Sequence, residues 1–323
     1  MKSTYRVLGS RTVILILIFL LSIVSICIGA KEFSLLDLIK GNEHVVNLVI
    51  ISRIPRLVSI LVTGASLSIA GLIMQTITSN KFVSPATAGT MEWCKFGIIL
   101  AMIFTTGESK MVKILFAFAV SLAGTIFFMF MLQKIKFKSI VLVPLVGMML
   151  GNVVSSLTGY LAYKHDVIQN MSSWLQGSFS LVIKGNYELL YIGIPFLIIA
   201  YCYANKFTIA GMGDGFATSL GLNHKAVVTV GMVIVAFITS ITVVTIGSVP
   251  FIGLVVPNIV AMYKGDNLKN TLFDTAIFGA LFVLVCDIIG RTIYAPYEVS
   301  ISVVISIIGS ILFLTLILRK EGK

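Results

Sequence analysis

The sequence is poor in charge. Charged side chains make up 11% of its 323 residues, and only 13 residues are acidic, whereas an ordinary soluble domain has roughly 25% charged residues. Hydrophobic residues make up 58% instead, and the mean hydropathy is +1.04. This composition excludes a soluble catalytic domain and predicts an all-α integral membrane protein.

Cysteine and histidine are also scarce. The four cysteines are scattered without a Cys-x-x-Cys spacing, and the three histidines lie far apart. The sequence therefore predicts no disulfide framework, no metal site and no cofactor. A membrane-embedded enzyme would need nucleophiles or metal ligands that converge at membrane depth, and these residues do not supply them, so no catalytic residue is predicted.

Nucleotide-binding motifs are missing as well. The glycine-rich stretch at residues 211–215 has neither the G-x-G-x-x-G spacing nor the G-x-x-x-x-G-K-[ST] pattern. A transporter with this sequence would therefore depend on ATP hydrolysis by another subunit. The net charge of +11 is typical of a membrane protein whose Lys and Arg accumulate in cytoplasmic loops, and nucleic-acid binding is not predicted.

Long apolar runs dominate what the sequence does contain. The first, residues 12–30, follows three basic residues and is interpreted as a signal anchor rather than a cleaved signal peptide. Five more spans are predicted at residues 57–78, 91–106, 114–133, 139–163 and 189–205. Residues 226–263 are too long for one crossing and are divided at Gly247-Ser248-Val249-Pro250. Residues 271–290 and 299–318 complete about ten transmembrane helices.

The basic residues predict the orientation. With the N-terminus inside, 15 of the 24 Lys and Arg residues lie on the cytoplasmic side and 9 outside, which favours an N-in/C-in topology. In the outer loop at residues 164–188, residues 167–175 could form a short helix near the surface. The chain is predicted as one transmembrane permease domain, residues 1–323, with a polar cytoplasmic loop at about 206–225.

The sequence predicts a second short helix in the cytoplasmic loop. Asp214 can cap this helix and Gly221 can end it. Such a helix suits docking to another protein, although a solvated connector has the same pattern. Ionisable residues near membrane depth are Glu92, Lys95, Asp274, Asp287 and Glu298. They could form a proton relay, but most lie near span ends, where they can cap helices.

Several motifs carry a resemblance to a known family. Arg53-Ile54-Pro55-Arg56, Gly64-Ala65, Gly71-Leu72-Ile73-Met74-Gln75 and Asn80 resemble its pattern R-[IL]-P-R…G-A…G-x-x-x-Q…N. The strongest match runs from Gly247 to Asn258 and continues through Gly265-Asp266, Asp287, Arg291, Pro296 and Glu298. The sequence is thus similar to the FecCD-like permease subunits of type II ABC importers for iron-siderophore complexes, haem and vitamin B12.

The resemblance implies a function and partners. It implies a ten-helix permease in the bacterial plasma membrane that conducts ferric-siderophore complexes. Residues 84–93 are similar to the subgroup for catecholate siderophores. The implied partners are membrane lipid, a second permease subunit (a homodimer or a paralogous heterodimer), two ATP-binding subunits and an extracytoplasmic siderophore-binding protein. The alternatives are a haem or cobalamin permease and an ion-coupled secondary transporter, which would need intramembrane carboxylates and usually inverted repeats.

The resemblance also implies three sets of site residues. Docking of the binding protein is implied for Arg53, Arg56 and Arg291. Coupling to the ATPase is implied for Asp214, Gly215, Ala217, Leu220 and Gly221. A cytoplasmic gate is implied for Asn80, Phe82, Lys138 and Ser139. The sequence departs from the family pattern at Lys81, Asn258 and Ser300-Ile301-Ser302, which leaves the pore geometry there open.

Overall fold

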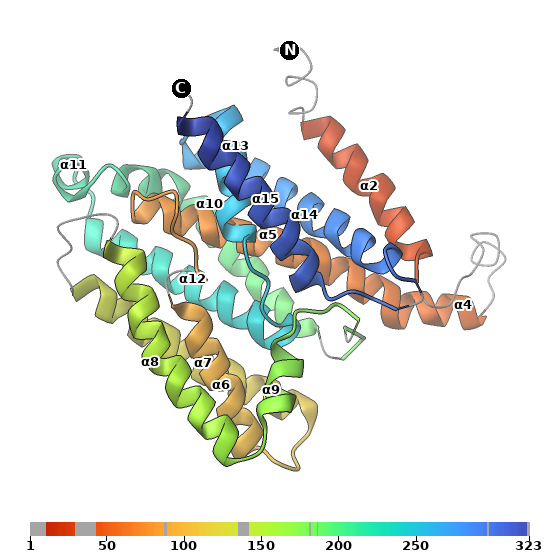
Figure 1. Cartoon of the computed structure of the whole chain (residues 1–323). Coiled ribbons are helices and arrows are strands. Elements are labelled where there is room, and N and C mark those ends of the chain that lie inside the picture. The colour runs from red at the N-terminus through yellow and green to blue at the C-terminus, as the bar shows by residue number, and fades with distance from the viewer. Residues whose placement is uncertain are drawn as a thin grey trace.

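Helices form almost all the regular structure in the computed structural model, which describes residues 11–29, 43–86, 89–134, 142–180, 182–185, 187–295 and 297–321. The elements are α2 (Arg11–Cys27), α4 (Glu43–Leu48), η1 (Val49–Arg53), α5 (Ile54–Ile77), α6 (Thr90–Phe104), α7 (Lys110–Lys134), α8 (Leu142–Lys164), α9 (Ile168–Leu175), η2 (Glu188–Ile192), α10 (Gly193–Ala210), α11 (Asp214–Ser219), α12 (His224–Ile246), α13 (Ile252–Lys264), α14 (Leu268–Thr292) and α15 (Ile301–Glu321). Figure 1 shows their arrangement, with α11 and α4 at opposite ends of the bundle.

A helix lies at each predicted apolar segment. By length and composition, seven of the described helical segments can cross a membrane, namely α4 to α5, α7, α8, η2 to α10, α12, α14 and α15. The apolar helices α2 and α13 are shorter. The all-helical membrane fold is therefore confirmed, whereas the count of ten crossings and the N-in/C-in orientation stay predictions. The expected short helix in the outer loop is also present, as α9.

The second predicted span begins earlier than expected. Instead of starting near residue 57, the helix runs without a break from Glu43 to Ile77. Pro55 has no N–H, so within a regular α-helix the carbonyl of Ile51 would lack its donor. The wider π-turn η1 occupies this place, and the backbone N–H of Lys184 donates to the Ile51 oxygen at 3.0 Å. Proline is thus accommodated inside the helix rather than at its start.

The predicted division after α12 is confirmed. Helix α12 ends at Ile246, Gly247 follows with φ +99°, and Phe251 precedes α13 with φ +64°. A proline at 250 and two left-handed residues cannot continue an α-helix. The chain therefore leaves the helical path and restarts as the short helix α13.

Helix α5 is the centre of the packing. It contacts α14, α13, α12 and α10, and most of its residues from Pro55 to Gln75 are buried. Glycines permit the closest approaches, because a Cβ at Gly64 would collide with the carbonyl of Gly279 in α14, and one at Gly71 with Gly253 in α13. Small residues allow helix backbones to approach closely in membrane proteins. These two close approaches hold α14 and α13 in fixed positions against α5.

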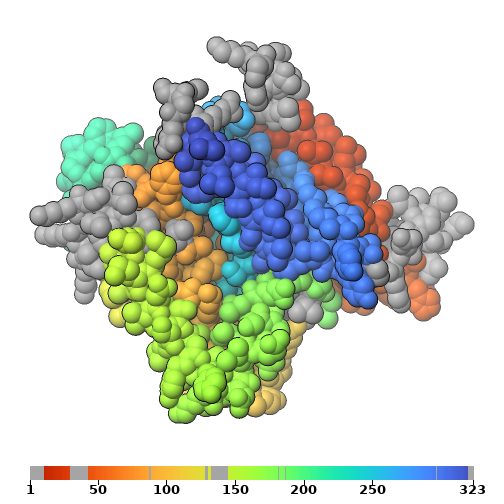
Figure 2. All heavy atoms as spheres, in the orientation of Figure 1, coloured from red at the N-terminus to blue at the C-terminus, as the bar shows by residue number. Residues whose placement is uncertain are grey.

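One face of the molecule leaves two helices largely uncovered. Figure 2 shows α15 (dark blue) and α8 (yellow-green) on this face. Exposed apolar side chains follow one stripe of α15, at Val303, Ile307, Ile311, Leu314 and Leu318. An apolar helix surface of this size can face lipid or another membrane subunit.

Candidate docking, gate and coupling sites

The three arginines predicted for docking lie together at the end of the bundle away from α11. Arg56 is on the first turn of α5, Arg53 on the preceding η1, and Arg291 on the last turn of α14. Their exposed fractions are only 8%, 8% and 4%. They are therefore buried rather than presented on a free surface.

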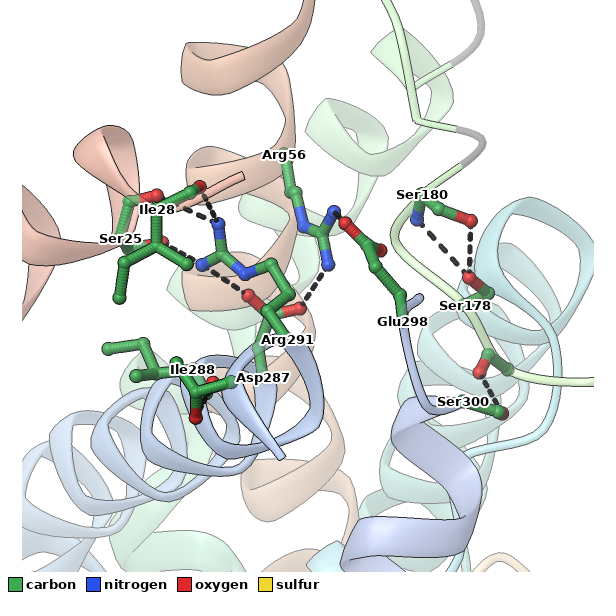
Figure 3. Close-up of polar contacts among 12 residues, drawn as sticks. Ser25, Ile28, Arg56, Ser178, Ser180, Asp287, Ile288, Arg291, Glu298 and Ser300 are labelled. Atoms are coloured by element: carbon green, nitrogen blue, oxygen red, sulfur yellow. Dashed lines mark hydrogen bonds and ion pairs between the residues drawn. The ribbon is translucent and has the colours of Figure 1, made fainter. Parts of the chain in front are cut away.

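Two acidic residues, Asp287 and Glu298, hold Arg56 and Arg291, as Figure 3 shows. Arg56 Nη2 donates to Asp287 Oδ1 at 2.8 Å, and Arg56 Nη1 donates to both carboxylate oxygens of Glu298, at 2.8 and 2.9 Å. Arg291 Nη2 lies 2.6 Å from Asp287 Oδ2, in an ion pair whose angle falls outside hydrogen-bond geometry. Asp287 thus bridges two guanidinium groups. We call these four residues and Arg53 the charge cluster.

The charge cluster also fastens α2 to the bundle. Arg291 Nη1 donates to the backbone oxygens of Ser25 and Ile28, both at 2.8 Å, and Arg53 Nη1 donates to Ile28 at 2.9 Å. The last carbonyls of a helix have no partner inside it, so cations satisfy them well. With three cations and two anions the cluster has a formal charge of +1. Glu298, with 27% of its side chain exposed, is its most accessible acid.

The gate prediction divides between described and undescribed residues. Lys138 and Ser139 lie outside the described residues. Asn80 is buried, and its Oδ1 accepts from the Phe82 backbone N–H at 2.9 Å, which fixes the turn after α5. The Phe82 ring is 49% exposed and packs edge to face on Phe313 of α15, with centroids 6.0 Å apart. The structure thus brings this turn, residues 78–83, against α15; we call it the gate segment.

Two departures from the family pattern meet at the gate segment. Asn258 Nδ2, on α13, donates to the backbone oxygen of Lys81 at 2.8 Å, and Lys81 Nζ pairs with Asp266 Oδ1 at 2.8 Å. Gln75 Nε2 donates to the Gly253 oxygen at 3.1 Å, so α13 is tied to α5 as well. The changes at 81 and 258 are therefore linked by one hydrogen bond. A hollow of about 280 Å³ opens beside them.

The third departure joins three segments at the far end. Ser300 Oγ donates to the Gly177 oxygen at 2.7 Å, and Ser302 Oγ donates to the Ser248 oxygen. Ser248 N donates in turn to the Leu175 oxygen at 2.9 Å. The hydroxyls therefore connect the start of α15 with the residues that follow α9 and α12, and these residues pair in the isolated bridge between Gln176 and Ser248.

Helix α11 occupies the predicted coupling position with a different start. Its N-cap is Gly213, and Asp214 is the first helical residue, so the expected cap by Asp214 is wrong. Asp214 Oδ1 instead lies 3.6 Å from His224 Nδ1 at the start of α12. The carboxylate is still favourably placed, because it sits at the positive end of the helix dipole.

The predicted end of α11 at Gly221 is confirmed. Gly221 has φ +74°, and its N–H donates to the Thr218 oxygen at 2.9 Å while Leu222 N donates to Ala217 at 3.0 Å. These two bonds define a Schellman motif. Ala217 is fully buried against the bundle. The helix is therefore held in one orientation by its inner face and its C-terminal turn.

Sequence reasoning missed the apolar surface of α11. Met212, Phe216 and Leu220 are 60%, 50% and 59% exposed, and only Leu220 is among the predicted coupling residues. Phe216 lies on α11, and Met212 and Leu220 lie just before and just after it. A patch of this kind at the loop predicted to be cytoplasmic suits a protein partner. Among the described residues, no group of three His, Cys, Asp or Glu side chains could hold a metal ion.

Comparisons with known proteins give the family of the chain. Residues 14–319 match the model of the FecCD transport family. The chain is 52% identical over 307 residues to the petrobactin import system permease protein of Bacillus subtilis (strain 168), which covers 95% of this chain and 97% of that protein. It is 36% identical over 301 residues to the ferric-anguibactin transport system permease protein of Vibrio anguillarum (strain ATCC 68554 / 775). This match covers 93% of this chain and 96% of that protein.

A solved structure is similar to the whole fold. It is described as an inward-facing conformation of a metal-chelate type ABC transporter. The TM-score is 0.80, and the match covers 95% of this chain and 97% of that one at 24% sequence identity. At this identity the likeness supports the arrangement of the helices and nothing finer.

Proposed function

Because the chain belongs to the FecCD transport family, we propose that it conducts ferric-siderophore complexes through the membrane as the permease subunit of an ABC importer. Members of this family are multi-pass, non-enzymatic subunits of such importers. The observation that carries the siderophore assignment is the 52% identity, over 95% of this chain, to a permease named for petrobactin import. The similarity of residues 84–93 to the catecholate subgroup narrows the proposed class to catecholate siderophores.

The direct test is uptake by a reconstituted importer. The permease would be placed in vesicles with its ATPase and binding protein, and ⁵⁵Fe-labelled ferric catecholate would be supplied with ATP. We expect ATP-dependent uptake that unlabelled ferric catecholate competes away and that haem and cobalamin do not. Competition by haem or cobalamin would favour the alternative permeases. Uptake driven by a proton or sodium gradient without ATP would favour the secondary transporter.

We further propose the assembly that this function requires. Two permease subunits would face each other, each would contact one of two ATP-binding subunits, and one binding protein would deliver the substrate. The exposed apolar stripe of α15 supports a membrane-embedded contact with the second subunit. ATP binding would then bias the permease pair between outward and inward states, because the ATPase dimer interacts differently with each state.

The coupling role is proposed for α11. Its buried Ala217 and its Schellman turn hold the helix rigidly, while Phe216 and Leu220 remain exposed to a partner. A rigid helix with an apolar surface can pass a displacement to α10 and α12, to which it is directly joined. The gate role is proposed for Asn80 and Phe82 within the gate segment, and for Lys138 and Ser139 by resemblance.

The docking role is proposed for Arg53, Arg56 and Arg291 in a form that respects their burial. Asp287 is 2% exposed, so an acidic side chain of the binding protein can reach Arg56 only from the side that Glu298 now occupies. Docking would therefore exchange one carboxylate for another at Arg56. Such an exchange affects association rate and register more than total affinity.

The topology is proposed as ten crossings with both termini in the cytoplasm. The test is labelling of single cysteines by a membrane-impermeant maleimide in intact cells whose native cysteines are replaced. We expect labelling at Lys164→Cys and Lys184→Cys, and labelling at Phe216→Cys only after permeabilisation, because loops on opposite sides differ in access. Labelling of the Phe216 variant in intact cells would overturn the orientation.

A further inference from the structure

The turn that ends α5 contains a residue type that is unusual for its conformation. Ser79 has φ +49°. Its N–H donates to the Thr76 oxygen at 3.1 Å, and the Asn80 N–H donates to the Gln75 oxygen at 3.0 Å, so the turn is a Schellman motif. Glycine is the usual residue at this position, because an L side chain in the left-handed conformation costs free energy. The turn alone therefore does not explain a serine here.

The hydroxyl of Ser79 connects two segments that are far apart in the sequence. Ser79 Oγ donates to the Gly211 oxygen at 2.7 Å, directly after α10. The two backbones also approach closely, because a Cβ on Gly211 would lie 2.7 Å from the Thr76 oxygen. Gly211 has φ −66°, which any residue can adopt, so the close approach rather than the backbone conformation requires glycine. The end of α5 is thus held to the end of α10 by a hydrogen bond and by direct packing.

The end of α10 leads directly into α11. Three residues, 211–213, separate the two helices, and each of their N–H groups donates to a backbone oxygen in the last turn of α10, at 2.9, 3.1 and 3.1 Å. The oxygen of Gly213 then accepts from the Ala217 N–H at 3.0 Å, inside α11. These hydrogen bonds limit changes in the dihedral angles of the connection. A displacement of α11 therefore reaches Gly211.

The hollow of about 280 Å³ beside the gate segment leaves room for a movement. Its lining includes Ser79 and Gly211 and continues onto Ala261 of α13. Lys81 and Asp266 also line it, and their ion pair restrains the gate segment only weakly because both side chains are exposed. A tightly packed interior would resist a shift of this turn. The open space beside the contact lets the gate segment move without a collision.

We infer that Ser79 is a positioning residue that joins α11 to the gate segment. Its hydroxyl transmits the position of α11, through Gly211, to the turn that contains Phe82. The inference rests on the proposed coupling role of α11 and on the proposed gate role of this turn. It also accounts for the serine, because glycine would form the same turn with less strain but could not donate to Gly211. Local strain is often retained at functional sites for a reason of this kind.

The experiment is amide hydrogen exchange in the purified full-length permease, measured by mass spectrometry with and without its ATPase. It needs neither nucleotide nor siderophore. In the wild type, the bound ATPase should slow exchange in residues 78–83 severalfold, because a fixed α11 fixes Gly211 and, through Ser79, the gate segment. In Ser79→Gly the ATPase should bind with unchanged affinity, and this protection should be lost. Ser79→Ala lacks the same hydroxyl and should give the same result.

Asp166→Gly is the matched control. Asp166 has φ +55° and ends α8 in the same motif, since its N–H donates to the Tyr163 oxygen at 3.2 Å and the Val167 N–H to the Ala162 oxygen at 3.0 Å. Both glycine substitutions relieve a left-handed side chain, so each should change the unfolding temperature by only a few degrees. Only Ser79→Gly removes a hydroxyl bonded to the end of α10. Asp166→Gly should therefore keep the protection of the gate segment.

Three results would overturn the inference. The first is wild-type protection in Ser79→Gly, and the second is equal loss of protection in Asp166→Gly, which would assign the effect to released strain. The third is a wild type whose gate segment exchanges at the same rate with and without bound ATPase. Binding of the ATPase is measured separately, by surface plasmon resonance on the same samples. A wild type that does not bind the ATPase would instead remove the proposed function, and the inference with it.

Discussion

At the scale of single residues, Asp287 is the central anion of the charge cluster. It is 2% exposed and contacts the guanidinium groups of both Arg56 and Arg291. A buried ion pair contributes little net stability compared with apolar packing, but removal of one partner leaves the other charge buried without compensation. The energetic consequence of a substitution at Asp287 is therefore much larger than the value of the pair itself.

The first prediction concerns this asymmetry. Asp287→Asn should lower the free energy of unfolding by about 3 to 5 kcal/mol, because two buried cations lose their shared anion. Thermal unfolding of the purified permease in detergent measures the loss. The control is Asp266→Asn, which removes an exposed pair with Lys81 and should change stability by less than about 1 kcal/mol. Equal stability of the two variants would contradict the description of the cluster as buried.

Part of the charge cluster could be read from the sequence. Asp287 and Arg291 are four residues apart, a spacing that pairs side chains on one helix. Arg56 and Glu298 are separated by 242 positions, and no local pattern indicates that they meet. The family resemblance identifies all these positions without indicating that the arginines are already occupied by acids of the same chain. Only the packing of α5 on α14 reveals that.

At the scale of elements, α11 depends on its terminal glycine. The positive φ of Gly221 places two N–H groups on the last carbonyls of the helix. A β-branched residue in this conformation is strained by about 1 to 2 kcal/mol and displaces the turn. Because the helix is only six residues long, a displaced turn changes the position of its whole exposed side.

The second prediction follows from this geometry. Gly221→Val should leave the permease inserted but reduce ATP-driven uptake severalfold, while the ATPase continues to hydrolyse ATP. Uptake and phosphate release by the same vesicles measure the uncoupling. Gly185→Val is the matched control, since Gly185 also has a positive φ and open space but lies in the loop proposed to be on the outer side. Similar uncoupling by both variants would remove the coupling role from α11.

The third prediction concerns the link between α13 and the gate segment. Asn258→Leu keeps the size of the side chain but removes the donor to the Lys81 oxygen, at a cost of about 0.5 to 1.5 kcal/mol. We expect uptake to fall, and the labelling of Phe82→Cys to lose its response to a non-hydrolysable ATP analogue. Asn270→Leu, at an exposed position in the first turn of α14, is the control. A preserved response in Asn258→Leu would show that α13 does not position the gate.

The elements differ in how well the sequence predicts them. The division between α12 and α13 is predictable because Gly247 and Pro250 act locally. The extension of the α5 helix back to Glu43 is not predictable, because Pro55 and the charged residues beside it indicate that a helix starts there. A backbone donor from residue 184, far along the chain, satisfies the carbonyl that Pro55 leaves open. The tertiary contact thereby overrides the local signal.

At the scale of the whole molecule, the two ends of the bundle have different construction. The end near α11 presents apolar side chains on and beside a short helix, and the opposite end presents a partly open charge cluster. Apolar contact suits a permanent partner, whereas an ion pair with one partly exposed acid suits a partner that associates and leaves. This difference agrees with an ATPase that stays bound and a binding protein that exchanges.

The last prediction tests the exchange of carboxylates at Arg56. Glu298→Gln removes the accessible anion while Asp287 still compensates the buried charge. The binding protein should then associate severalfold faster at low salt, and the gain should shrink as salt rises, because screening weakens the attraction between its acids and Arg56. Surface plasmon resonance on nanodisc-embedded permease measures this rate.

The control is Glu108→Gln, which removes an exposed acid before α7 and changes net charge by the same amount. If the whole field of the outer face determines association, both variants should accelerate it equally, since each adds one positive charge to the molecule. If Arg56 receives an acidic side chain of the binding protein, only Glu298→Gln should accelerate association. An association rate in Glu298→Gln equal to that of the wild type would mean that Arg56 stays committed to the fold, and that the three arginines secure α2, α5 and α14 rather than the binding protein.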